Sequence, residues 1–262
     1  MQQRQTDRYL YFRELARTSE KYYIPYISKY KKITGTKVLE IGCGDGGNLL
    51  PFAGMGCHTT GVDIDNGRII DAKRFFEERH ADGLFIVSDV FMLEGMERSF
   101  DLVICHDVIE HIENKTVFLI KLQRFLRADG LLFIAFPAWQ MPFGGHQQIC
   151  HSKVISLLPF IHLLPNPVYK ALLKRGGESE RCIGELLSIK KTQMPIGPFE
   201  QLLHQAALTI VDRTLFFINP HYETKFGLKP RKLSALIEKM PYIRNFCTTS
   251  CFYLLRQKEV RE

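Results

Sequence analysis

The sequence has no C-x-x-C motif, and its seven cysteines form an odd, scattered set. Such a set does not make a disulfide framework, and several of its members fall in apolar stretches that are typical of strands. We therefore interpret them as small buried hydrophobic residues. Near Cys247 and Cys251 no further cysteine or histidine pair completes a zinc site, so we expect no metal there.

Long apolar runs are also missing. No uncharged stretch approaches the ~20 residues that a membrane-spanning helix needs. The first residues lack the apolar segment of a secretory signal, so we expect a cytoplasmic protein. Hydrophobic residues nevertheless make up 45% of the 262 residues, which is enough for a full core. The length fits one large α/β domain, or a core domain with a small appendage.

A strong charge of one sign is absent as well. The chain has 35 Lys and Arg against 28 Asp and Glu, a net charge of +7. This mild excess suits an anionic partner such as nucleic acid, a phosphorylated substrate or a lipid surface. The basic residues are spread along the chain, so a solvated surface explains them better.

Short apolar runs alternate with helical patterns from residue 37 onward. Strands are predicted at 37–41, 59–62, 84–88, 101–105 and 131–136, and helices at 46–55, 66–80, 110–112 and 115–127. Strands that alternate with helices run parallel and are joined by crossovers. The pattern therefore predicts a doubly wound α/β sheet.

Four parts of the chain differ in composition. They are an N-terminal helical lid at 1–35, a sheet core at 36–140, a proline-rich helical cap at 141–197 and a continuation of the core at 198–262. Pro25 is expected to divide the lid into two helices. The continuation is predicted to hold a helix at 198–207, strands at 208–218 and 246–256, and an amphipathic helix through Leu233, Leu236, Ile237 and Met240.

A glycine cluster follows the first predicted strand, in the run VLEIGCGDGG at 38–47. Gly42, Gly44 and Gly47 match the dinucleotide fingerprint G-x-G-x-x-G, while Gly42, Gly44 and Gly46 read as G-x-G-x-G. Glycines allow the tight turn and the close approach of backbone to a ligand. A loop of this kind before a helix usually favours an anionic group.

Carboxylates around this loop point to a different ligand. Glu40 and Asp45 would repel a pyrophosphate, and they suit a ligand with positive charge, such as the ammonium and sulfonium of S-adenosylmethionine. Asp63 lies 23 residues after Glu40, at the end of the second predicted strand, where an acid can bind both ribose hydroxyls. Asp89 ends the third strand, and it either accepts from an adenine amino group or caps the next helix.

Five runs, taken in order, resemble the class I S-adenosylmethionine-dependent methyltransferases. They are VLEIGCGDGG, GVDID, SDV, FDLVICHDVIEHI and LRADGLLFIAFPAW, within about residues 36–139. They are most similar to the small-molecule branch that includes the ubiquinone-biosynthesis-type O-methyltransferases. The resemblance implies a Rossmann-like sheet of seven strands, six of them parallel and the last antiparallel. It also implies S-adenosylmethionine as cofactor and S-adenosylhomocysteine as product.

The resemblance further implies cofactor-binding residues at the ends of the first four strands. They are Glu40, Gly42, Cys43, Gly44 and Gly46, then Asp63 and Ile64, then Asp89 and Val90, and finally Cys105 and His106. The loop residues line the methionine end of the cofactor, and Cys105 and His106 approach it. Asp63 binds the ribose. Ile64, Asp89 and Val90 surround the adenine.

The methyl acceptor is less clear from the sequence. The N-P-P-Y element that base-amino methyltransferases carry after strand four is replaced by CHDVIEH, and no Pro-Cys element supports cytosine chemistry, so we expect no DNA partner. We expect a hydroxyl of a sugar, phenol or lipid-linked intermediate. An RNA or protein methyltransferase is the first alternative, and a non-catalytic cofactor-binding module is the second.

The cap contains a nearly uncharged segment, VISLLPFIHLLPNPVYKALL at 154–173. Prolines interrupt it, so it can pack as a helical cap over the site. Alternatively, it lies at a membrane interface and approaches a lipid-linked substrate, which would be a peripheral membrane contact.

His111 and His146 are the candidate catalytic residues. In the run DVIEHI, Asp107, Glu110 and His111 share one face of a helical turn, and His146 in FGGHQQ follows strand five at the neighbouring edge. A histidine near its unperturbed pKa can take a hydroxyl proton at neutral pH. As alternatives, His111 caps the helix and His146 lies on the surface. Some relatives bind a divalent metal through E-x-x-E-H, but Asp107 is one methylene shorter than the first glutamate, so we expect no metal.

Overall fold

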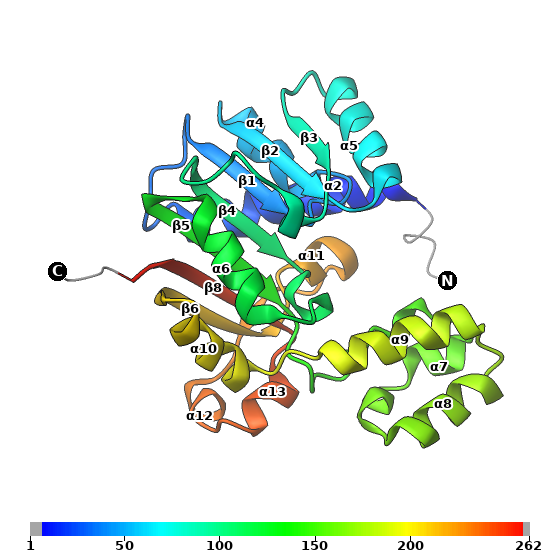
Figure 1. Cartoon of the computed structure of the whole chain (residues 1–262). Coiled ribbons are helices and arrows are strands. Elements are labelled where there is room, and N and C mark those ends of the chain that lie inside the picture. Colours follow the sequence, from blue (N-terminus) through cyan, green and yellow to red (C-terminus); the bar gives the residue numbers. More distant parts are fainter. Residues whose placement is uncertain (1–6, 259–262) are drawn as a thin grey trace.

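The computed structural model, which describes residues 7–258, contains a single sheet of eight strands with helices on both faces (Figure 1). The strand order is β3-β2-β1-β4-β5-β8-β6-β7. The strands are β1 (Lys37–Ile41), β2 (His58–Asp63), β3 (Leu84–Val87), β4 (Phe100–His106), β5 (Leu126–Phe136), β6 (Leu208–Ile218), β7 (Arg231–Lys232) and β8 (Ser250–Gln257).

Six strands of the sheet are parallel. Strands β1 to β5 pair in parallel, and β8 runs antiparallel between β5 and β6, which gives β6 the direction of the first five. The doubly wound, Rossmann-like sheet with its last strand, β8, antiparallel is therefore confirmed. The short β7, antiparallel to β6, is an eighth strand beyond the seven expected.

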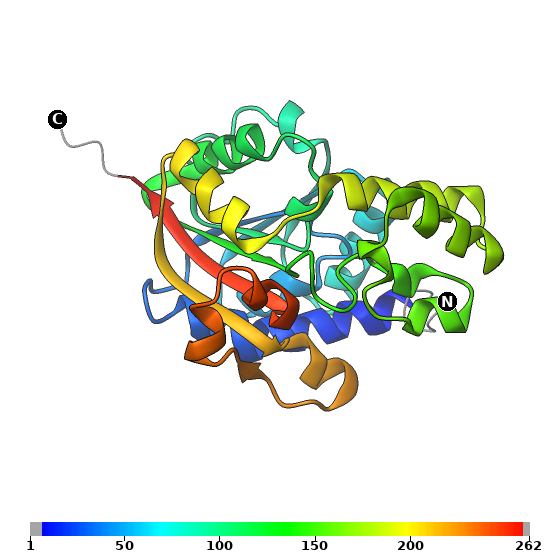
Figure 2. The same cartoon turned by 90° about the horizontal axis from the view of Figure 1, so that it is seen from below.

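Both faces of the sheet are buried, and this explains the apolar runs in the sequence. Along β5, Leu132 and Ile134 enter one hydrophobic core, while Phe133 and Ala135 enter the other. The helices α6 (Lys115–Phe125) and α10 (Ile196–Gln205) cover the first face. The other face packs against α2 (Arg8–Thr18), α4 (Leu50–Gly54) and α5 (Asn66–Glu78). Figure 2 shows α6 and α10 on one side of the sheet and α2 on the other.

The N-terminal helices differ from the expected break at Pro25. Helix α2 continues through a π-helical turn, η1 (Ser19–Tyr23), into α3 (Ile24–Ile27). Pro25 lies in the first turn of α3, directly after the π-helical turn, and the helix continues through it. The expected lid at 1–35 also includes residues 1–6, which lie outside the described residues.

Three helices of the cap form a lobe beyond the carboxyl ends of the parallel strands (Figure 1). They are α7 (Lys153–Leu157), α8 (Asn166–Arg175) and α9 (Glu180–Thr192), with a 3-10 turn, η6 (Ile161–Leu163), before α8. Their apolar side chains, such as Tyr169 and Leu186, form a third hydrophobic cluster separate from the two cores of the sheet. The division of the chain into four parts stays a prediction.

The C-terminal part holds three short helices, α11 (His221–Phe226), α12 (Ala235–Glu238) and α13 (Ile243–Cys247). The amphipathic helix expected through Leu233 and Leu236 is wrong in extent. The backbone N–H of Leu233 donates to Leu215 and extends the strand ladder, while Leu236 is 81% exposed on the single turn of α12. Because 243–247 are helical, β8 begins at Ser250 rather than at 246. Within residues 7–258, no helix is both long and apolar enough to cross a membrane.

Candidate functional site

Two neighbouring cavities open at the carboxyl ends of β1, β2 and β4. The smaller, of about 430 Å³, is lined by residues that follow β2 and β3, including Asp63, Ile64 and Asp89. The larger, of about 550 Å³, is lined by the glycine loop and by His146. Both cavities include Gly42, Arg68, Asp107 and His111, so they meet at this point. Each has the size of a small-molecule site.

The glycine loop can be built only with glycine. Gly42, Gly44 and Gly46 all have positive φ angles, of 72°, 52° and 81°. A Cβ on Gly42 would lie 2.3 Å from Cγ2 of Val108, and one on Gly46 would lie 2.9 Å from the ring of Phe85. Gly42 and Gly44 line the cavities, whereas Gly46 serves the packing beneath them.

Glu40 lies behind the loop, fully buried at the end of β1. Its Oε1 accepts a 2.7 Å hydrogen bond from Nδ2 of Asn48, and its Oε2 has no partner among the described residues. Burial raises the pKa of Glu40 to about 8, although the Asn48 bond lowers it. An additional cation or N–H donor would satisfy the second oxygen.

Asp63 is held rigidly at the end of β2. Its Oδ2 accepts from the N–H of Gly44 at 2.8 Å, and its Oδ1 accepts from the N–H of Asp65 at 2.9 Å. This carboxylate lines the smaller cavity together with Ile64, which is 73% exposed. A fixed acceptor beside an exposed apolar surface suits a ribose with an attached base.

Asp89 caps the 3-10 turn η3 (Val90–Met92), through a 2.9 Å bond from the N–H of Phe91 to its Oδ1. The capping alternative therefore applies, and Asp89 and Val90 line the smaller cavity as well. Cys43 and His106 line the larger cavity. Cys105 does not, because its side chain is fully buried in the core beneath β4.

Asp107 and His146 both have left-handed backbone conformations, with φ angles of 53° and 58°. Such angles are rare outside glycine and tend to occur at functional sites. They also correct one expectation about the run DVIEHI. The helical turn is a single 3-10 turn, η4 (Ile109–His111), and Asp107 lies before it rather than on a shared face with Glu110 and His111.

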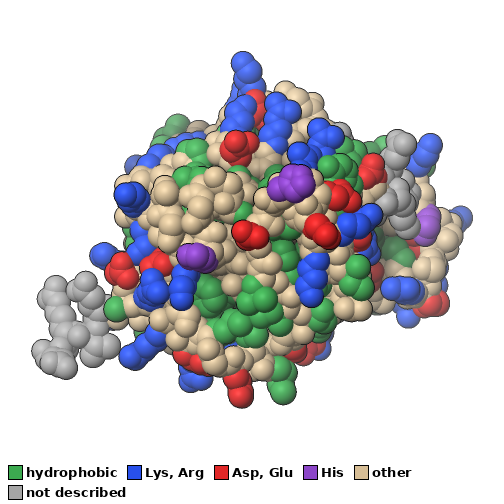
Figure 3. Space-filling model, turned by 90° about the horizontal axis from the view of Figure 1, so that it is seen from above, with side chains coloured by type: hydrophobic (Ala, Val, Ile, Leu, Met, Phe, Trp, Pro, Cys, Tyr) green, Lys and Arg blue, Asp and Glu red, His purple; other side chains and the backbone are tan. Residues whose placement is uncertain are grey.

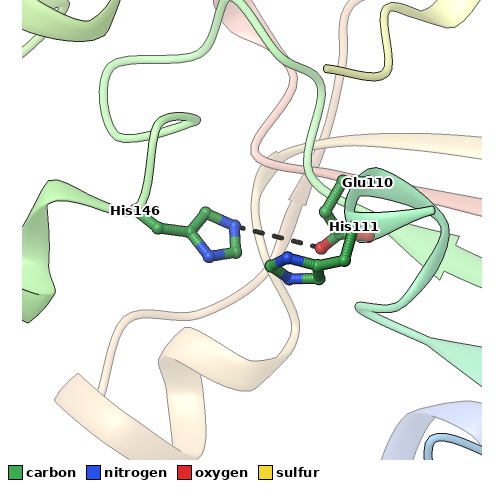
Figure 4. A group of neighbouring side chains, drawn as sticks. All are labelled: Glu110, His111 and His146. Atoms are coloured by element: carbon green, nitrogen blue, oxygen red, sulfur yellow. Dashed lines mark ion pairs between the residues drawn. The ribbon is translucent and has the colours of Figure 1, made fainter. Parts of the chain in front are cut away.

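Glu110, His111 and His146 come together at the edge of the larger cavity (Figure 4). The Nε2 atom of His146 lies 3.9 Å from Oε1 of Glu110, and the two imidazole rings are 5.1 Å apart between centroids. One ligand atom from each residue lies within 4.8 Å of the others. The two candidate histidines, far apart in sequence, therefore share one site with a carboxyl group.

Burial sets the charges of this site. It raises the pKa of Glu110 well above its usual range, and the nearby Asp107 raises it further. It lowers the pKa of His146 to about 4, with His111 adding to the effect, and it also lowers the pKa of His111. At neutral pH both imidazoles are neutral and can accept protons. Two imidazoles and a carboxylate are also a possible ligand set for a divalent cation.

Several charged residues of the larger cavity were missed by the sequence reasoning. Arg8 and Arg68 line it, and both act on Asp45. Burial raises the pKa of Asp45, and the two arginines lower it. Asp45 therefore faces arginines of this chain, and the prediction that it faces a cationic ligand did not consider them. No sequence signal connects the loop to Arg68, which lies in the first turn of α5.

Comparisons with known proteins agree with this geometry. Residues 39–134 match a family model described as a methyltransferase domain. Ubiquinone biosynthesis O-methyltransferase of Rickettsia felis is 30% identical over 108 residues, covering 41% of this chain and 44% of that protein. Its counterpart from Maricaulis maris is 32% identical over 111 residues, covering 42% and 43%. The matched region thus spans less than half the length of either relative.

Solved structures share the fold over most of the chain. A putative sarcosine dimethylglycine methyltransferase from Galdieria sulphuraria has a TM-score of 0.60 at 11% identity, covering 92% of this chain and 85% of that one. Magnesium protoporphyrin IX methyltransferase of Synechocystis, solved with S-adenosylhomocysteine, has a TM-score of 0.55 at 15% identity, covering 94% and 84%. The family match at residues 39–134 and the order of the cofactor motifs make this part of the chain similar to the class I S-adenosylmethionine-dependent methyltransferases.

Proposed function

We propose that this chain transfers a methyl group from S-adenosylmethionine to a hydroxyl of a small molecule. The observation that carries the proposal is the junction of the two cavities at Gly42 and Asp107. One cavity presents a fixed carboxylate and an apolar wall, as an adenosine requires. The other presents two neutral imidazoles beside a buried carboxyl group, as a hydroxyl acceptor requires.

The residues behind the loop fit this cofactor. The unpaired Oε2 of Glu40 would accept from the cofactor's ammonium, directly or through a water, and Asp63 would accept from the ribose hydroxyls. Ile64 and Val90 would enclose the adenine. The bound cofactor supplies a methyl group already activated by a sulfonium, so the protein has to align the acceptor and exclude water.

His146 takes the proton from the acceptor. The bound cofactor would supply the methyl group: its carbon–sulfur bond would break as the hydroxyl oxygen bonds to the methyl carbon, and the neutral imidazole of His146 would receive the hydroxyl proton. With a pKa of about 4, His146 is a weak base. A weak base can deprotonate an acidic hydroxyl more readily than a less acidic one. A phenol, with a pKa of about 10, is more acidic than a sugar hydroxyl. We therefore favour a phenolic acceptor.

The cap is where a lipid-linked acceptor would approach. Val154 and Leu157 of α7 are 70% and 69% exposed, and Val168 of α8 is 52% exposed. Lysines lie next to them, at Lys153 and Lys170, and mixed apolar and cationic surfaces bind at membrane interfaces. We propose that α7 and α8 contact a membrane surface or the apolar tail of the acceptor.

Nucleic acid is a weaker candidate acceptor. On the face shown in Figure 3, Lys and Arg are interspersed with Asp and Glu and do not form one continuous basic patch. Strong phosphate binding normally uses clustered cations.

The proposal is tested by methyl transfer from radiolabelled S-adenosylmethionine to a panel of phenols, sugars and polyprenylated phenols. We expect transfer to a phenol. The product should be a methyl ether, which is stable to alkali. His204→Gln, at an exposed residue of α10, is the matched control for His146→Gln. Transfer only to RNA or protein, or none to any acceptor despite tight cofactor binding, would contradict the proposal.

A further inference from the structure

The cap holds a second group of metal-ligating side chains, apart from the cavities described above. Cys150, Glu178 and Cys182 are all buried, and one ligand atom from each lies within 4.8 Å of the others. Cys150 follows the 3-10 turn η5 (Gln147–Ile149), Glu178 precedes α9, and Cys182 lies in the first turn of α9. Two separate segments of the chain therefore bring two thiols and a carboxyl group together.

Glu178 is held as a carboxylate in this group, with no lysine or arginine beside it among the described residues. Burial would raise its pKa, but the N–H groups of Ser152 and His151 lie 2.9 and 3.0 Å from its oxygens. Together with the thiol of Cys182 and the imidazole of His151, they outweigh burial and hold the pKa below the usual range. Within residues 7–258, no lysine or arginine forms an ion pair with it. Buried charges are normally paired or bound to a metal.

The hydroxyl of Tyr169 gives an independent indication. Tyr169 is fully buried in the same hydrophobic cluster as both cysteines, and its Oη has no hydrogen-bond partner among the described residues. The thiols of Cys150 and Cys182 are its neighbours in this cluster. Two neutral thiols are weak acceptors for this hydroxyl, whereas a metal-bound thiolate is a strong one.

We propose that Cys150, Glu178 and Cys182 bind a zinc ion, with the imidazole of His151 as the fourth ligand. Two thiolates, a carboxylate and an imidazole are ligands that Zn²⁺ takes in tetrahedral sites. His151 is exposed and follows Cys150 directly, and its ring lies close enough to act on the charge of Glu178. Binding releases the thiol protons, and the resulting thiolate accepts from Tyr169.

A zinc ion here would connect the cap to the proposed acceptor site. Cys150 lies on the same loop as His146, four residues further on. Helix α9 starts at the zinc group and ends at Thr192, whose Oγ1 donates to the backbone oxygen of Glu110 at 2.6 Å. The ion would therefore join the two segments that carry Glu110 and His146. The site is structural, so its test does not require methyl transfer.

The test is a titration of the reduced, chelator-treated full chain with Co²⁺. We expect one Co²⁺ to bind with the near-ultraviolet absorption of thiolate-to-cobalt charge transfer, and Zn²⁺ to remove this signal. The Cys150→Ser/Cys182→Ser variant should lose the signal. Cys57→Ser, at a buried thiol next to the N-terminal part of the sheet, should keep it. His111→Ala/His146→Ala should also keep it, because the acceptor site has no thiolate.

Thermal unfolding gives a second measurement that needs no variant. Zn²⁺ should raise the Tm of the wild-type chain, since a ligand that binds only the folded state stabilises it. The proposal is overturned if wild type gives no charge-transfer band, or if Zn²⁺ leaves its Tm unchanged. Formation of a Cys150–Cys182 disulfide with oxidised glutathione, in a reduced chain that binds no Co²⁺, would also overturn it. If His151→Ala binds Co²⁺ with unchanged affinity, His151 is not the fourth ligand.

Discussion

His146 and Glu110 lie 3.9 Å apart, between Nε2 and Oε1, and burial has opposite effects on their affinities for protons. The pKa of His146 is lowered to about 4, while the pKa of Glu110 is raised well above its usual range. Each residue is therefore held in its neutral form over a wide span of pH. The pair resembles an acid–base arrangement in which either residue can take or return a proton as the local charge changes.

This pair should give two opposite dependences of stability on pH. The folded pKa of His146 lies below the unfolded value of 6.5, so its contribution to stability is present above pH 6.5 and is lost as the pH falls toward about 4. The folded pKa of Glu110 lies above the unfolded value, so its contribution is present at low pH and is lost as the pH rises.

Two variants measure these dependences. Relative to wild type, His146→Gln should gain stability by on the order of 2 kcal/mol as the pH falls from about 6.5 to about 4. Glu110→Gln should instead gain relative stability as the pH rises. Urea unfolding at several pH values checks both, with His204→Gln as the control for removal of a histidine. Equal pH profiles for all four proteins would contradict the assignment.

Gly42 offers a test of the cofactor loop. Gly42→Ala places a methyl group 2.3 Å from Cγ2 of Val108, at a φ of 72° that costs an alanine about 1–2 kcal/mol. We expect a lower Tm and weakened binding of S-adenosylhomocysteine in calorimetry. Gly197→Ala is the matched control, because its Cβ meets nothing within 4 Å on a helix. Full cofactor affinity in Gly42→Ala would show that the loop does not approach the ligand.

The strands could be predicted because most of them are buried on both faces. The inner strands β4 and β5 contain the apolar runs LVIC at 102–105 and LLFIAF at 131–136. By contrast, β7 consists of two exposed basic residues, Arg231 and Lys232, and no apolar pattern marks it. The length of α12 was overestimated because apolar residues at helical spacing predict one helix from Leu233 onward. In the structure, Leu233 instead extends a strand.

The cofactor motifs could also be predicted from the sequence, whereas the acceptor site could be predicted only in part. Glycines with positive φ and acids at strand ends are local features, so they appear in the sequence. The meeting of His146 with Glu110 depends on the path of a long loop, and the left-handed conformation of Asp107 depends on tertiary packing. The sequence predicts a cationic ligand for Asp45 because the electrostatic effect of Arg68 on this carboxyl group is visible only in three dimensions.

Asp63 should be the most important single acceptor for the cofactor. Asp63→Ala removes the proposed ribose acceptor, and it also removes the oxygens that accept from the N–H groups of Gly44 and Asp65. It should weaken cofactor binding by roughly 1–3 kcal/mol. Asp129→Ala, at an exposed carboxylate paired with Lys31, should leave binding unchanged. Isothermal titration calorimetry with S-adenosylmethionine and with NAD makes the comparison. Tight NAD binding with no binding of the methyl donor would disprove the cofactor assignment.

Variants of His111 and His146 distinguish general-base catalysis from catalysis by a metal ion. His146→Ala or His111→Ala should lower the rate ~10²–10⁴-fold, as expected for loss of a general base, while cofactor affinity stays within a few-fold. After brief EDTA treatment that leaves the proposed cap zinc in place, we expect full activity without added Mg²⁺. If EDTA abolishes transfer and Mg²⁺ restores it, Glu110, His111 and His146 are metal ligands, since their ligand atoms already lie within 4.8 Å of one another.

The cap should be separable from cofactor binding. Its hydrophobic cluster is distinct from both cores of the sheet, and the hydrogen bond from Thr192 to Glu110 is one of its links to the site. The turn after α8 is exposed at Arg175 and Gly177, so trypsin should cut there first, and a bound acceptor should slow the cut. Replacing 150–182 by a short glycine-serine linker should abolish methyl transfer while calorimetry still shows S-adenosylhomocysteine binding. If the shortened chain also loses cofactor binding while its sheet remains folded by circular dichroism, the cap contributes to the cofactor site and the proposed division is wrong.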